Sequence, residues 1–138
     1  MVRFYKLLGS ALALAVISTT AHAQVKAGPN GLFLQMLAET GCDSKYSDDK
    51  KADLFRTQYK NKQMTVTGEV STVRDGEVSI KVLRTTLTHD IQVKLADKKA
   101  AYDLEKGQRV TVSFKVTYHG GCILSYSGED GVLVNLTN

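Results

Sequence analysis

A two-residue alternation of apolar and polar side chains, repeated in several short segments, constrains this chain more than any other feature. The clearest segment is 109–118, where valine and phenylalanine side chains alternate with polar ones, as in Val112-Ser113-Phe114. Such alternation is typical of strands with one buried face. It predicts five strands, near residues 64–71, 78–82, 91–95, 109–118 and 122–127, with residues 132–136 extending or completing the sheet.

The order of these segments predicts the fold class. Asp75-Gly76 is a strong hairpin turn between the first two strands. Asp97 can cap a short helix over 98–105 between the third and fourth strands. This order matches the OB-fold, a closed or partly open five-stranded barrel, and Gly68 suits a strand that bends sharply. We therefore expect a mainly β, OB-fold-like barrel, with another small β-barrel or an α+β roll as the alternative.

A helical extension is expected before the barrel, over residues 24–60, with the barrel itself over 61–138. Apolar residues at helical spacing predict a helix over 31–39, capped by Asn30 and ended at Thr40-Gly41. A second short helix is expected over 48–59. The extension and the barrel are predicted to form one domain.

The first 23 residues have the pattern of a cleavable signal peptide. Arg3 and Lys6 precede an apolar run, and small residues at Ala21 and Ala23 predict cleavage after Ala23. The run of about 11 residues is shorter than the roughly 20 that span a bilayer. The sequence thus predicts a bacterial periplasmic or secreted protein, with no membrane span in the mature chain.

Cys42 and Cys122 are the only cysteines, and an oxidising compartment favours one disulfide between them. The alternative, a catalytic thiol with His119 three residues before Cys122, lacks an activating context. Two thiols and well-separated histidines also lack metal-ligand spacing. We therefore predict a disulfide, no metal and no cofactor.

Two segments carry a resemblance to a known family. They are YKNKQMTVTGEV at 59–70 and LEKGQRVTV at 104–112. In these segments the chain resembles the tRNA-anticodon-binding-like OB-fold family of exported bacterial proteins, over roughly residues 55–126. The resemblance implies the barrel fold, with Gly68 at a bend and Gly107 at a turn. The name of the family implies an ancestral nucleic-acid-binding fold, but a fold alone does not transfer function.

Charge and composition disfavour nucleic acid as a partner. The chain has 18 lysines and arginines against 14 acidic residues, and removal of the signal leaves 16 against 14. A nearly balanced surface exerts little attraction on a polyanion. The outward positions of the second and third strands carry no aromatic residue for base stacking, and Phe114 and Tyr118 have the phase of the core. These outward positions are Ser79, Lys81, Gln92 and Lys94.

No arrangement of acids, bases or nucleophiles indicates an enzyme. His89 and His119 are expected to be solvated loop residues. The remaining prediction is a non-enzymatic exported binding module or adaptor that engages a protein or cell-envelope ligand through barrel loops. Leu83 and Leu87 favour a protein contact. The alternative is binding of an oligomeric anion, either single-stranded nucleic acid or glycan. The candidate loop residues are Arg84, Thr86, Leu87, His89, Tyr118 and His119.

Overall fold

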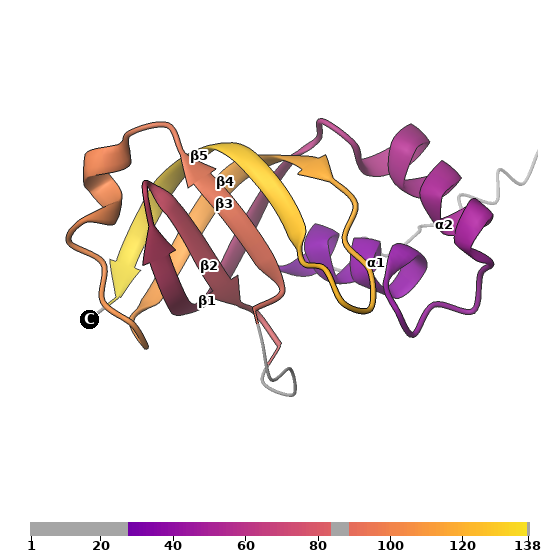
Figure 1. The fold of residues 1–138 in the computed structure, drawn as a ribbon, viewed down its shortest axis with the longest axis horizontal. Helices are drawn as coiled ribbons and strands as arrows, with labels where there is room; N and C mark the ends of the chain where they lie inside the picture. Colours follow the sequence, from indigo (N-terminus) through magenta and orange to yellow (C-terminus); the bar gives the residue numbers. More distant parts are fainter. Residues whose placement is uncertain (1–27, 84–88, 138) are drawn as a thin grey trace, which may run out of the picture.

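The computed structural model describes residues 28–83 and 89–137 and confirms the predicted fold class (Figure 1). Five strands close into a barrel in the order β1-β2-β3-β5-β4. β3 and β5 run parallel, whereas the other neighbouring strands are antiparallel. The result is an OB-fold-like barrel. Its strands are β1 (Gln63–Arg74), β2 (Glu77–Lys81), β3 (Ile91–Leu95), β4 (Arg109–Tyr118) and β5 (Tyr126–Thr137).

Side chains of the predicted apolar phase fill the barrel. Val66, Val112 and Phe114 are fully buried, together with most of the other alternating apolar residues. Gly68 lies where β1 leaves its pairing with β4 and begins its pairing with β2. A Cβ atom there would lie 2.5 Å from the carbonyl oxygen of Lys81. The position therefore accepts only glycine because the two backbones approach so closely.

Two helices and a π-helical turn cover one end of the barrel, opposite the 3₁₀ turn η2 (Figure 1). The predicted second helix is divided between α2 and η1, and the predicted helix over 98–105 is only one 3₁₀ turn. Ser47 caps α2 by accepting a hydrogen bond from the backbone N–H of Lys50. These elements are α1 (Gly31–Thr40), α2 (Asp48–Leu54), η1 (Phe55–Tyr59) and η2 (Lys98–Ala101).

Asn30 does not cap α1 through its side chain, which corrects the prediction. Its amide instead joins the start of α1 to the middle of β1. The Asn30 Oδ1 atom accepts from the Thr67 N–H at 2.6 Å, and the Nδ2 atom donates to the Thr67 carbonyl at 3.0 Å. Both hydrogen bonds of the Asn30 side chain are made to β1. They therefore connect the helical extension to the barrel instead of capping α1.

The last strand differs from the prediction at its start and at its centre. β5 begins at Tyr126 rather than Cys122, and it continues through Gly128 and Gly131 without a break. The structure explains these glycines by close packing, because a Cβ atom at Gly128 would overlap the ring of Phe114. The pairing of this part of β5 with β4 is irregular, with shifts in register along β4.

Two side chains on the outside of the sheet also differ from expectation. Ser79 is buried, and Ser71 Oγ donates a hydrogen bond to its carbonyl oxygen at 3.4 Å. Tyr118 is 54% exposed rather than part of the core, because β4 ends there, beyond the packed interior. In the part of the chain that the structure describes, no helix is long and apolar enough to cross a membrane.

Candidate functional site

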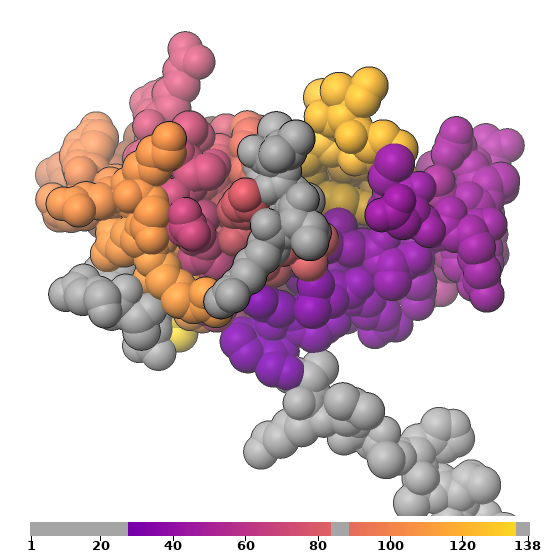
Figure 2. Space-filling model, turned by 90° about the horizontal axis from the view of Figure 1, so that it is seen from below, coloured from indigo at the N-terminus to yellow at the C-terminus, as the bar shows by residue number. Residues whose placement is uncertain are grey.

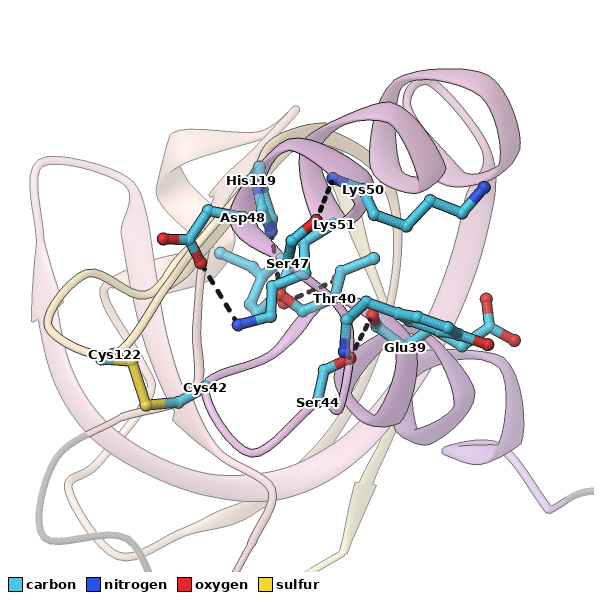
Figure 3. Close-up of polar contacts among 12 residues, drawn as sticks. Glu39, Thr40, Cys42, Ser44, Ser47, Asp48, Lys50, Lys51, His119 and Cys122 are labelled. Atoms are coloured by element: carbon cyan, nitrogen blue, oxygen red, sulfur yellow. Dashed lines mark hydrogen bonds and ion pairs between the residues drawn. A yellow bond between two sulfur atoms is a disulfide. The ribbon is translucent and has the colours of Figure 1, made fainter.

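The Cys42–Cys122 disulfide joins the end of α1 to the loop between β4 and β5, here called the 119–125 loop (Figure 3). The S–S distance is 2.04 Å and the two Cα atoms are 4.7 Å apart, which confirms the predicted pairing. Both cysteines are exposed, so the bridge lies at the surface. It holds the 119–125 loop against the helical extension.

His119 is part of this attachment rather than a solvated loop residue. Its ring stacks on Phe55 with 5.0 Å between ring centroids, and its Nε2 atom is 3.0 Å from the carbonyl oxygen of Thr40 (Figure 3). Gly120 follows against the backbone of Tyr126, where an added Cβ would lie 2.6 Å from the nitrogen. The first half of the loop is therefore held by stacking, a hydrogen bond and close backbone packing.

A buried hydroxyl pair supports the same region from below. Thr40 Oγ1 donates to the Met36 carbonyl at 2.8 Å, which leaves its oxygen to accept from the Tyr126 hydroxyl, also at 2.8 Å. Burial raises the pKa of Tyr126 above its ordinary value. The hydroxyl thus stays protonated and serves as a structural donor.

The loop between β2 and β3 meets the 119–125 loop through its last two residues. The Asp90 carboxylate accepts from the backbone N–H groups of Val82 and Leu83 at 2.7 and 2.8 Å, which closes the base of that loop. Ser125 Oγ donates to the His89 carbonyl at 3.0 Å, and the Tyr126 N–H donates to that of Asp90 at 3.2 Å. These bonds hold His89 and Asp90 against the end of the 119–125 loop and the start of β5.

A groove of about 210 Å³ lies where α1, the β2–β3 loop and the 119–125 loop meet. Its lining combines apolar side chains with the disulfide and one exposed carboxylate. Ile123 is 95% exposed and Leu124 is 60% exposed. In Figure 2 the golden 119–125 loop projects beside the indigo and purple helical extension. The lining includes Leu37, Asp43, Leu83, His89, Ile123 and Leu124.

Two further hollows differ in character from this groove, named here the disulfide groove. One lies on the other side of the bridge and includes His119 and the Asp48–Lys51 ion pair of 3.3 Å. The other lies on the barrel wall and is lined by Glu69, Lys81 and Arg109 with two apolar neighbours. Among residues 28–83 and 89–137, no cluster of His, Cys, Asp or Glu is suited to hold a metal ion.

The structure brings together some of the predicted site residues. His89 lines the disulfide groove and His119 supports it from behind, whereas Tyr118 lies outside it. The predictions on Arg84, Thr86 and Leu87 fall outside the described residues.

Sequence reasoning missed Ile123, Leu124 and Asp43. The apolar pair after Gly120-Gly121-Cys122 falls in the strand predicted near 122–127, whereas β5 begins only at Tyr126. The two consecutive apolar residues break the alternation of the other strands, and this break was the available signal of an exposed loop.

Comparison with known proteins does not identify the chain. No model of a known protein family matches it, and no curated protein sequence is significantly similar. The resemblance to the tRNA-anticodon-binding-like family stays a prediction, and function is inferred from the disulfide groove.

Proposed function

We propose that this chain is an exported, non-enzymatic binding module, or adaptor, that engages a protein or cell-envelope ligand at the disulfide groove. One observation carries the proposal: Ile123 and Leu124 are 95% and 60% exposed on a loop that is attached at both ends. Burying an aliphatic side chain contributes roughly 1.5–3 kcal/mol, and folding leaves most of that gain unused here. A ligand that covers both side chains would recover it, less the cost of association.

Two polar groups at the groove, Asp90 in its lining and His119 behind it, are engaged in structural hydrogen bonds. The Asp90 carboxylate accepts two backbone hydrogen bonds, and the His119 ring nitrogen is bonded to a backbone carbonyl. A general acid or base must instead reach the proton of a substrate. Both groups act here to hold the loops in place.

Export is proposed from the predicted signal peptide and is compatible with the disulfide. The mature protein is expected to begin at Gln24. N-terminal sequencing of protein recovered from the periplasm or the medium tests this, and an intact Met1 on that protein would refute it.

A site-specific photocrosslink tests the binding role of the groove. Replacing Ile123 with benzoylphenylalanine should give an adduct in the envelope of the bacterium that produces the protein. Tyr102, which is 72% exposed beside η2 at the other end of the barrel, provides the matched control position. Adduct formation at 123 that does not exceed that at 102 would refute the proposal.

Binding of an oligomeric anion is the second candidate, because Lys81 and Arg109 line the hollow on the barrel wall. Glu69 lies between Lys81 and Arg109, and its negative charge would repel an anion, so anion binding is the weaker of the two candidates. Polyanion binding weakens steeply with salt, because counterions are released on association. Titration with single-stranded oligonucleotides and acidic glycans at several salt concentrations tests it, with Lys81→Gln as the variant. Salt-independent binding, or none, would exclude this candidate.

A further inference from the structure

We infer that the disulfide groove takes a peptide segment in which apolar side chains adjoin a lysine or arginine. This rests on the proposed function and specifies the chemistry of the partner. Three features of the groove carry it: its apolar walls, the unused backbone donors of the 119–125 loop, and the sign of its charge.

The apolar walls set the size of what can bind. Leu37 of α1, Leu83 at the start of the β2–β3 loop and Leu124 face a groove of about 210 Å³. Sites for drug-sized molecules are roughly 300–1,000 Å³. The groove therefore suits one or two aliphatic side chains of a longer ligand better than a complete small molecule.

The backbone of the 119–125 loop favours a peptide over a lipid. Within the described residues, no hydrogen bond uses the N–H groups of Ile123, Leu124 or Ser125. Hydrocarbon has no acceptor for such groups, so inserting this loop into a bilayer would leave them unsatisfied. An extended peptide supplies carbonyl oxygens at the same spacing as its side chains. The apolar contact and the backbone contact thus point to the same occupant.

The charge of the groove favours a basic residue in that peptide. Both charged residues in the described lining, Asp43 and Asp90, are acidic. Asp90 is engaged with the backbone, whereas Asp43 is exposed on the rim and forms no ion pair with any described residue. A cation beside the apolar anchors would meet the carboxylate of Asp43, which favours a basic residue over an acidic one at that position. Exposed ion pairs of this kind change affinity by about twofold to fivefold.

Selection from a random 12-residue peptide display library against the purified oxidised protein tests the inference. Selected peptides should combine apolar residues with lysine or arginine. In titrations of the corresponding synthetic peptides, Leu124→Ser should weaken binding about tenfold or more, because a buried aliphatic contact is lost. Val132→Ser, at a side chain 57% exposed on β5, is the matched control and should leave affinity unchanged.

The charge is tested separately with Asp43→Lys, which should replace the preference for basic peptides by one for acidic peptides. Asp103→Lys makes the same charge change after η2 and should preserve the original preference. Two results would overturn this inference and leave the proposed function standing. In the first, the selected peptides require Leu124 but are not enriched in lysine or arginine. In the second, the Asp43→Lys variant prefers basic peptides as strongly as the wild type does. Failure to select any peptide that depends on Leu124, with no photocrosslink at position 123, would overturn both.

Discussion

Removing the disulfide should destabilise the protein by about 4.5 kcal/mol, a large part of the total stability of a small domain. The bridge spans 80 residues, and the chain-entropy model assigns a loop of that length this loss when the unfolded chain is released. Both cysteines are exposed, so Cys42→Ser with Cys122→Ser opens no buried cavity and adds no buried polar group. The change in stability therefore isolates the covalent link.

Urea unfolding followed by far-UV circular dichroism measures this difference between the oxidised wild type and the double variant. Reduced wild type should match the double variant, and reductant should not change the double variant further. A loss below about 1 kcal/mol would refute the reasoning, because the unfolded chain would then be equally restricted with or without the bridge.

Two further predictions concern the barrel and its helical cover. Gly128→Ala should lower the free energy of unfolding, measured in urea, by roughly 1–3 kcal/mol because the new Cβ would overlap the Phe114 ring. Gly121→Ala is the control and should cost less, because the space around Gly121 is open. Equal losses of stability in the two variants would contradict the packing argument. Burial and the hydrogen-bonded Glu39 carboxylate raise the pKa of Tyr59, so stability should fall as pH rises above about 10, where the tyrosine of the unfolded chain ionises first. Tyr59→Phe should flatten that fall in urea midpoints taken between pH 9 and 11, and an unchanged slope would refute the assignment.

The role of His119 illustrates why the site was harder to predict than the fold. In the sequence it precedes Gly120-Gly121, a context typical of an exposed turn. In the structure its partners are Phe55 and the carbonyl of Thr40, the latter 79 residues away in the chain. A contact of this kind leaves no periodic trace, because it depends on how the helical extension packs on the barrel.

Sequence alone determined the barrel, because strand formation follows a local period. Alternating side chains, the Asp75-Gly76 turn and the order of the segments predict a five-stranded barrel, closed or partly open, and the structure shows that it is closed. The cysteine pair was equally accessible, since a chain with two cysteines allows only one intramolecular bridge.

Only the tertiary structure decided where a ligand could bind. The disulfide groove is assembled from α1 and the residues after it, the two ends of the β2–β3 loop, and the 119–125 loop, segments that are far apart in the sequence. The apolar nature of Ile123 and Leu124 suggests a strand, but both are exposed because β5 starts only at Tyr126 and they lie in the loop before it. Burial depends on which segments pack together, and a local pattern of residues does not contain that information.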